Sequence, residues 1–216
     1  MTEPVSIQVV SDFVCPWCYV GKKRMEKALA GSGTDAAVVW LPFQLSPDMP
    51  PEGKNRKEHY DSIFGAERAA TIMSSMEDTG REEGIEFTYT DDAMSPNTLK
   101  AHALVHYAQM TQDQTGVDVD ALVEALFHAH HVECRDIGDV DVLLDLAAKA
   151  GLDADAVRAC LDSGEETEAV NQMMEQIRSQ QVSGVPFFVL GGQLGLSGAQ
   201  PADVFAQALE QLNESA

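Results

Sequence analysis

The sequence predicts an α/β protein whose two sheet-forming parts are separated by a long helical segment. Three observations predict this arrangement. A β-type apolar run at residues 5–10 leads into a helical pattern that opens with a Cys-Pro-Trp-Cys motif at residues 15–18. Nearly all of residues 55–181 carry apolar positions with the period of an α-helix. Near the end of the chain, two short apolar runs flank Gly191-Gly192, which is typical of a β-hairpin.

The first part of the chain is predicted to be a β-α-β unit. Residues 5–10 form the first strand, because they are rich in valine and isoleucine. A helix is expected from about residue 16 to residue 30, and the glycines of residues 31–33 end it. The apolar run 36–41 is the second strand. The proline-rich segment 46–51 cannot continue a strand and is predicted to be a linker.

The middle of the chain is predicted to be helical and to contain no strands. Asn55 and Glu58, three residues apart, match a capping box at the start of a helix. Ser95-Pro96 supplies the residue types of an N-cap and a first helical position, which predicts a second helix start. Further apolar helix faces recur at residues 122–127, 140–147 and 169–177.

The last part of the chain is predicted to add a hairpin and a helix. Residues 184–190 form one strand, Gly191-Gly192 the turn, and residues near 193–196 the second strand. A helix opens at Pro201. Without the helical segment, the order of elements is β-α-β followed by β-β-α.

That order is the order of the thioredoxin fold, so the predicted fold class is a thioredoxin fold with a large helical insertion. We expect a thioredoxin-like domain built from residues 1–50 and 182–216. Residues 51–181 form the inserted, all-helical domain in this prediction.

Composition restricts the class of partner and the compartment. The 216 residues carry a formal net charge of −21. Such a charge argues against binding to nucleic acid or to anionic membranes. The sequence shows neither a secretory signal pattern nor an apolar run long enough to cross a bilayer. Four cysteines are too few for a disulfide scaffold in a chain of this length. We therefore expect a cytoplasmic protein.

The Cys-Pro-Trp-Cys motif predicts a redox-active thiol pair. Two cysteines separated by two residues, at a junction between a strand and a helix, are typical of thioredoxin-like redox sites. Cys15 is expected at the helix N-terminus, where the helix dipole stabilises a thiolate. Cys18 is expected one turn further along and less accessible. The alternative, a structural zinc site, normally needs a second pair of ligands, and the sequence has no second motif of this kind.

Val185-Pro186 is predicted to lie beside the cysteine pair. In a thioredoxin-like fold a proline that opens this strand is where a cis peptide bond is expected, leaving the Val185 backbone free to pair with an extended substrate. An ordinary trans proline at a strand start is the alternative.

Six motifs in this order resemble those of the DsbA-like thioredoxin family, and within it the FrnE-like cytosolic branch. They are SDFVCPWCYVG at residues 11–21, PFQL at 42–45, SPNT at 95–98, RDIGD at 135–139, GVPFF at 184–188 and SGAQ at 197–200. The resemblance covers nearly the whole chain. It implies dithiol–disulfide oxidoreductase or isomerase activity on a thioredoxin fold.

The resemblance also implies roles for individual residues. Cys15 matches the attacking cysteine and Cys18 the resolving cysteine. The residues that the resemblance and the motif together assign to substrate binding are Pro16, Trp17, Asn97, Val185 and Pro186. The alternative for Trp17 is packing at the helix end, and the alternative for Asn97 is the role of a cap residue alone. No cofactor is expected beyond the cysteine pair, with glutathione as a candidate co-substrate. The expected partners are a disulfide-containing protein or small molecule, and thioredoxin or glutathione as reductant.

The remaining histidines and cysteines depart from the family pattern or lie outside it. His130-His131 and Cys134 stand where aromatic residues and a glycine are expected. His131 and Cys134, three residues apart, would form a metal-ligand pair only if the helix continued through both. Cys160 is predicted to be a small buried apolar residue on one helix face.

Two other function classes remain open from the sequence. Relatives in the same superfamily are glutathione-dependent transferases or resemble 2-hydroxychromene-2-carboxylate isomerase, and they typically carry serine at the position of Cys15. A transferase or isomerase of that kind would keep its activity without Cys18. A non-catalytic metal-binding module is the third hypothesis, and it requires bound metal.

Overall fold

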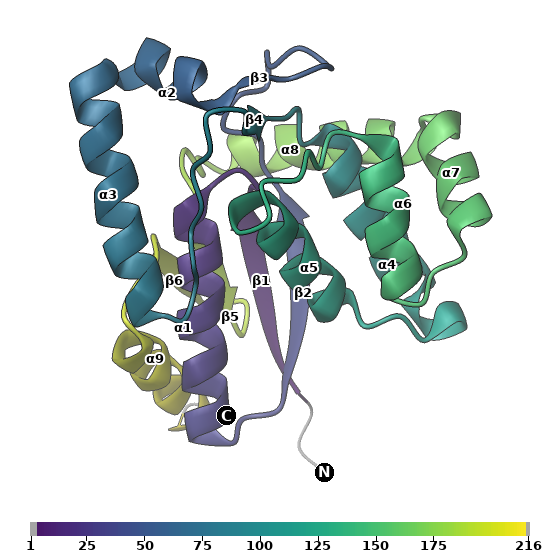
Figure 1. The fold of residues 1–216 in the computed structure, drawn as a ribbon. Helices are drawn as coiled ribbons and strands as arrows, with labels where there is room; N and C mark the ends of the chain where they lie inside the picture. Colours follow the sequence, from purple (N-terminus) through teal and green to yellow (C-terminus); the bar gives the residue numbers. More distant parts are fainter. Residues whose placement is uncertain (1–3, 215–216) are drawn as a thin grey trace.

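A four-stranded mixed sheet forms the centre of the protein (Figure 1). The computed structural model describes residues 4–214. The strands are β1 (Val5–Ser11), β2 (Ala36–Pro42), β5 (Phe187–Leu190) and β6 (Leu194–Ser197), in the spatial order β2-β1-β5-β6. β1 pairs with β2 in parallel and with β5 antiparallel, and β5 pairs with β6 as the predicted hairpin.

Two helices from the ends of the chain pack together against the sheet. They are α1 (Pro16–Ser32) and α9 (Ala202–Glu214), which lie side by side in Figure 1. Phe188 of β5 is fully buried against Phe205 of α9, with ring centroids 4.8 Å apart. Gly21 of α1 lies so close to β5 that an added Cβ would meet the Phe188 ring at 3.0 Å. The predicted α/β fold class with β-α-β and β-β-α parts is therefore confirmed.

The middle of the chain supplies seven helices, which Figure 1 shows above and beside the sheet. They are α2 (Arg56–Phe64), α3 (Ala66–Glu82), α4 (Leu99–Thr115), α5 (Val119–His131), α6 (Val140–Lys149), α7 (Ala154–Ser163) and α8 (Glu165–Ser179). Helices α4 and α8 both contact β2. Asn55 caps α2 by accepting the Glu58 N–H at 3.0 Å, as the capping-box pattern predicts.

One buried apolar cluster joins residues of β1, α1, α4 and α5, so the sheet and the helical segment share a core. The division into two domains at residues 50 and 182 stays a prediction, and residues 1–3 and 215–216 of the predicted thioredoxin-like domain lie outside the described range. No helix within residues 4–214 combines the length and the hydropathy that crossing a bilayer requires.

Two predictions about the middle segment are wrong. It does contain strands, because β3 (Lys54–Asn55) pairs with β4 (Met94–Ser95). A strand of two residues is too short to leave a periodic pattern in the sequence. The helix predicted to start at Ser95-Pro96 instead starts at Leu99, because Ser95 belongs to the small sheet. The Asn97 side chain then accepts the Leu99 N–H at 3.0 Å, within the turn that leads into α4.

Candidate active site

The end of β1 delivers Cys15 to the N-terminus of α1, where the sequence predicts it. Cys15 is the N-cap residue, in an extended conformation, and Pro16 occupies the first helical turn. The Cys15 N–H donates to the Asp12 carbonyl oxygen at 3.0 Å, and the Cys18 N–H donates to the Cys15 carbonyl oxygen at 3.0 Å. The tight turn between β1 and α1 therefore holds both cysteines of the motif at the helix end.

The segment before β5 completes the surroundings of the thiol. Cys15 Sγ lies 3.8 Å from the carbonyl oxygen of Val185, a residue 170 positions away in the chain. The Val185-Pro186 peptide bond is cis, as predicted. Pro186 also lies close to α1, since a Cβ added to Gly21 would be 3.2 Å from its ring. The structure therefore brings Cys15, Val185 and Pro186 together at the start of α1.

Both thiols of the motif are buried. Cys18 is 1% exposed and Cys15 is 4% exposed. Burial raises the pKa of the Cys18 thiol, and the neighbouring Cys15 raises it further, with Ser11 acting in the opposite direction. Cys18 is therefore held as a neutral thiol one helical turn beyond Cys15, which is the N-cap residue of α1. This arrangement suits Cys15 as the thiol that meets a substrate and Cys18 as the reserve thiol.

Trp17 and Asn97, two residues assigned to substrate binding from the sequence, have different surroundings. Trp17 is 43% exposed in the first turn of α1 and presents an apolar surface. Asn97 is half-buried; its amide nitrogen donates to the Met49 carbonyl oxygen at 2.7 Å and its amide oxygen accepts from Gln44 at 3.0 Å. Its amide thus joins two loops, the one between β2 and β3 and the one between β4 and α4, and its role in substrate binding stays a prediction.

A pocket of about 130 Å³ lies beside the cysteine motif, between α2 and the loops that follow β1 and β2. We name it the α2 pocket. Its rim carries three exposed apolar side chains, Leu45, Ile63 and Phe64. Its interior includes Asp12, Val14, Met49, Tyr60 and Thr98. The sequence analysis did not find this pocket, although Tyr60, Ile63 and Phe64 stand three and four residues apart on one face of α2.

Asp12 is the buried acidic group of this pocket. Its side chain is 1% exposed, and its Oδ2 accepts the Leu45 N–H at 2.8 Å. Its Oδ1 has no hydrogen-bond partner. The nearest base is His102, whose Nε2 lies 3.5 Å from Oδ1 but donates its proton to the Phe43 carbonyl oxygen at 3.0 Å. One oxygen of a buried carboxyl group is therefore left without a donor.

Tyr60 contributes a hydroxyl group to the α2 pocket, whose lining it shares with Asp12. Burial raises the pKa of Tyr60 to about 12; Arg56 opposes this shift, and negative charge on Cys15 and on Asp12 adds to it. The Tyr60 hydroxyl is therefore protonated at neutral pH.

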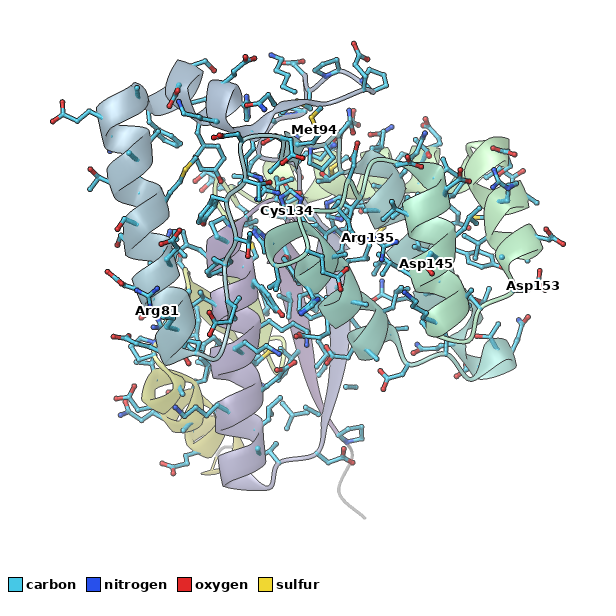
Figure 2. The ribbon with its side chains drawn as sticks, viewed as in Figure 1. Arg81, Met94, Cys134, Arg135, Asp145 and Asp153 are labelled. Carbon is cyan, nitrogen blue, oxygen red and sulfur yellow. The ribbon has the colours of Figure 1, made fainter. Side chains whose placement is uncertain are left out.

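The cluster of His130, His131 and Cys134 does not form the metal-ligand pair considered from the sequence. Helix α5 ends at His131, so Cys134 is not one helical turn further on. Figure 2 shows Cys134 beyond the end of α5, where its thiol donates to the Thr88 carbonyl oxygen at 3.3 Å. Within the described part of the chain, no group of three or more histidine, cysteine, aspartate or glutamate residues could hold a metal ion.

His131 is instead part of an aromatic stack beneath the cysteine motif. Its ring stacks on Tyr19 and Phe127 at centroid distances of 6.1 and 6.2 Å. Burial and the positive charge of Arg56 lower the pKa of His131 to about 3, while a hydrogen bond to the Phe13 backbone opposes both effects. The ring is therefore neutral and structural.

Cys160 differs from its prediction. It is partly exposed on α7 rather than buried, because Val157 occupies the buried face of this short helix. Burial raises the pKa of the Cys160 thiol to about 11, with Glu166 and Glu165 adding to the shift. Cys160 is a weakly reactive thiol away from the motif.

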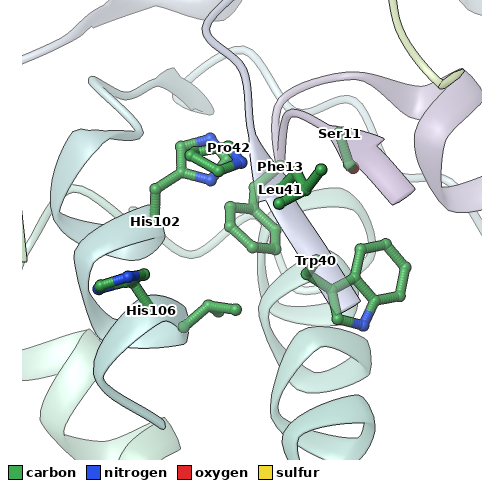
Figure 3. Close-up of a pocket in the computed structure, with 8 residues that line it drawn as sticks. Ser11, Phe13, Trp40, Leu41, Pro42, His102 and His106 are labelled. Carbon is green, nitrogen blue, oxygen red and sulfur yellow. The ribbon is translucent and has the colours of Figure 1, made fainter. Parts of the chain in front are cut away.

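A second cavity lies on the other side of the β1 end, under α4 (Figure 3). Figure 3 shows Trp40, Phe13 and the two histidines of α4, His102 and His106, around it. Its volume of about 10 Å³ is the space of one water molecule. The α2 pocket is therefore the larger of the two sites beside the β1 end.

Comparison with known proteins identifies the family. Residues 6–210 match the DSBA-like thioredoxin domain, and the chain belongs to this family. A crystal structure of a probable DsbA oxidoreductase, SCO1869 from Streptomyces coelicolor, is 33% identical; the match covers 96% of this chain and 89% of that one, with a TM-score of 0.85. The family consists of oxidoreductases and isomerases, so the chain is an enzyme of the DsbA-like oxidoreductase family.

Two more distant structures share the fold. The cytosolic disulfide reductase DsbM from Pseudomonas aeruginosa, solved with GSH, is 22% identical with a TM-score of 0.62, covering 96% of this chain and 99% of that one. A 2-hydroxychromene-2-carboxylate isomerase is 17% identical with a TM-score of 0.72, covering 97% of each chain. At these identities the similarity establishes the fold alone.

Proposed function

We propose that this protein is a cytoplasmic thiol–disulfide oxidoreductase or isomerase of the FrnE-like branch, with Cys15 as the nucleophile and Cys18 as the resolving thiol. The single observation that supports this most strongly is the position of Cys15. Cys15 is the N-cap residue of α1, its sulfur lies beside the Val185 carbonyl oxygen, and the neighbouring Cys18 is a buried neutral thiol. The cytoplasmic assignment rests on the cysteine usage, since four cysteines are too few for a disulfide scaffold in a chain of 216 residues.

The proposed cycle has two exchange steps. The Cys15 thiolate attacks one sulfur of a substrate disulfide; a Cys15–substrate disulfide forms as the substrate S–S bond breaks, and the other substrate sulfur leaves as a thiolate that takes up a proton. Cys18 then loses its proton to solvent and attacks Cys15 Sγ. The Cys15–Cys18 disulfide forms, and the second substrate sulfur leaves as a thiolate. The substrate gains two electrons and the protein loses two.

The electrons return from a second thiol. In the proposed cycle thioredoxin or glutathione reduces the Cys15–Cys18 disulfide, and no cofactor other than the cysteine pair takes part. Isomerisation needs no reductant: a second thiol of the substrate attacks the mixed disulfide before Cys18 does, and the protein stays reduced. In this proposal the substrate is a protein or small molecule that carries a disulfide; nucleic acids and membranes are not partners.

The substrate is proposed to bind along the segment before β5. The Val185 backbone would pair with an extended substrate segment beside Cys15 Sγ, in the manner of strand addition. Pro16, Pro186 and the exposed ring of Trp17 would pack against the apolar parts of that segment.

A redox titration tests the proposal. The protein is equilibrated with reduced and oxidised glutathione, and the state of each cysteine is read by thiol trapping and mass spectrometry. We expect one two-electron transition assigned to Cys15–Cys18, unchanged when Cys134 and Cys160 are both replaced by Ser. A midpoint near roughly −270 mV indicates a reductase or isomerase, and one near roughly −120 mV indicates an oxidant. If no Cys15–Cys18 disulfide forms at any ratio, the proposal is wrong.

The shared fold of 2-hydroxychromene-2-carboxylate isomerase supports one alternative, a glutathione-dependent transferase or isomerase. The Cys18→Ser variant separates the two functions. A glutathione-dependent transferase keeps its turnover in this variant, whereas the redox cycle stops at the mixed disulfide because the resolving thiol is missing.

A further inference from the structure

The α2 pocket is placed to receive the part of a substrate next to its disulfide. Asp12 and Val14 line the pocket and directly precede Cys15 in the chain. Tyr60 lines it as well, from the neighbouring helix α2. A disulfide that reaches Cys15 Sγ therefore presents its neighbouring residue to this pocket.

The size and the walls of the pocket indicate one aliphatic side chain. The volume of about 130 Å³ has room for a single side chain and not for a whole tripeptide. The wall residues Leu45, Met49 and Ile63 are apolar, which favours a methylene chain.

The interior of the pocket indicates a cationic end group. Asp12 lines the pocket, and its Oδ1 is a buried oxygen without a hydrogen-bond partner. A buried carboxylate oxygen without a donor is costly, so a ligand that supplies an N–H donor gains an unusually favourable contact. Thr98 and Ser95 add hydroxyl groups to the same wall.

None of the described basic side chains around the pocket donates a hydrogen bond to Asp12 Oδ1. Burial and the charge of Lys54 lower the pKa of His59, so its ring is neutral at neutral pH. The Arg56 guanidinium donates to the carbonyl oxygens of Met94 at 3.3 Å and His130 at 3.0 Å. His102 Nε2 donates to a backbone carbonyl, as described above.

We propose that the α2 pocket is a specificity pocket that binds a lysine or arginine side chain adjacent to the substrate cysteine, with the cationic end paired to Asp12. The net charge of −21 favours the approach of such basic substrates. This inference rests on the proposed thiol–disulfide exchange at Cys15.

The test compares three symmetric peptide disulfides that differ only in the residue after the cysteine: lysine, norleucine or glutamate. Norleucine keeps the methylene chain of lysine and lacks the ammonium group. The rate of Cys15–Cys18 disulfide formation is followed by thiol trapping at 0.5 M NaCl, where long-range steering is screened. We expect the lysine peptide to react about tenfold faster than the norleucine peptide, or more, and the glutamate peptide to be slowest.

Two variant pairs locate the effect. Asp12→Asn should bring the lysine rate down to the norleucine rate, whereas Asp141→Asn makes the same change of charge on a side chain that is 84% exposed and should keep the preference. Ile63→Lys at the rim should lower the lysine rate by occupying the pocket, and Met110→Lys, at a position that is 66% exposed on α4, is its control. The Ile63 pair decides the question if Asp12→Asn does not fold.

The possible failures are distinguishable. Equal rates for lysine and norleucine in the unmodified protein overturn the specificity pocket and leave the exchange chemistry standing. A full lysine preference that survives both Asp12→Asn and Ile63→Lys places the preference elsewhere and also overturns the inference. If none of the three peptides oxidises the cysteine pair, the proposed function fails and the inference fails with it.

Discussion

Replacement of Lys22 tests how the helix that carries the cysteines is attached to the rest of the protein. Lys22 is 1% exposed on α1, and its ammonium group contacts three carboxylates. These are Glu26 on the same helix, Asp120 at 3.0 Å and Glu124 at 3.1 Å, both on α5. Although burial alone would lower the pKa of Lys22, the three carboxylates raise it. Lys22→Met removes this shared cation and keeps most of the side-chain volume.

The size of the effect follows from burial. Breaking a fully buried ion pair costs about 3–5 kcal/mol, because the remaining charge is left unpaired. The partner carboxylates are 30–45% exposed, and water and Lys23 compensate part of the loss. We therefore expect Lys22→Met to lower the free energy of unfolding by about 2–3 kcal/mol. For a chain of this length that corresponds to a fall in Tm of roughly 4–12 °C.

The pH dependence supplies an internal control. The Lys23 and Lys22 contacts outweigh burial and lower the pKa of Glu124. Its contribution to stability is therefore present above its unfolded-state pKa of about 4.3 and is lost as pH falls through the lower folded-state value. Burial raises the pKa of Glu26, so that carboxylate takes up its proton at higher pH. The difference in the free energy of unfolding between the variant and the unmodified protein should thus become smaller below about pH 4.

The assay is urea unfolding followed by circular dichroism at pH 7 and at pH 3.5. Lys27→Met, the same substitution at an exposed position of α1, is the matched control and should change stability by less than about 0.5 kcal/mol. An unchanged or higher midpoint for Lys22→Met at pH 7 would refute the reasoning, since it would show that the three carboxylates do not need the buried cation.

Three further predictions concern the site and its supports. Cys18→Ser should accumulate a mixed disulfide between Cys15 and a peptide substrate, seen as an added mass; absence of the adduct contradicts the assigned resolving role. Gly53→Ala should destabilise the protein by about 1–3 kcal/mol in thermal unfolding, because Gly53 has φ +72° and its Cβ would lie 2.8 Å from the Ser95 carbonyl oxygen; an unchanged Tm contradicts this. His131→Phe should reduce the loss of stability on acidification. The pKa of His131 is lowered to about 3, so below about pH 6.5 the unfolded chain binds a proton at this residue that the folded protein does not bind. The free energy of unfolding therefore falls by up to about 1.4 kcal/mol per pH unit. Equal pH dependence of Tm in the two proteins between pH 7 and pH 5 would argue against a neutral buried ring.

The elements that the sequence predicts correctly are those with local signals. The first strand, the helix after the cysteine motif and the terminal hairpin each have a period or a turn signal within one stretch of chain. The small sheet of β3 and β4 has no such signal, because it consists of two pairs of residues about 40 positions apart. Because Ser95 belongs to β4, α4 starts at Leu99 and not at the predicted Ser95.

The candidate site divides in the same way. The cysteine pair and the Val185-Pro186 segment could be predicted, because a motif marks each of them. The α2 pocket could not, because Asp12, Leu45 and Tyr60 come from three separate segments. Asp12 and Leu45 lie within family motifs, but the resemblance assigns neither of them to binding. The unpartnered oxygen of Asp12 is a property of packing that no residue pattern encodes.

The contact between Cys15 and Val185 has a consequence for how the protein is made. The two residues are 170 positions apart, so at about 5–20 residues per second the ribosome needs roughly 10–30 s to add the second after the first. During that interval β1 lacks its neighbour β5, and Cys15 lacks the backbone carbonyl that lies beside its sulfur in the finished protein. The surroundings of the Cys15 thiol are therefore completed only when residues 185–190 of the 216 have been added.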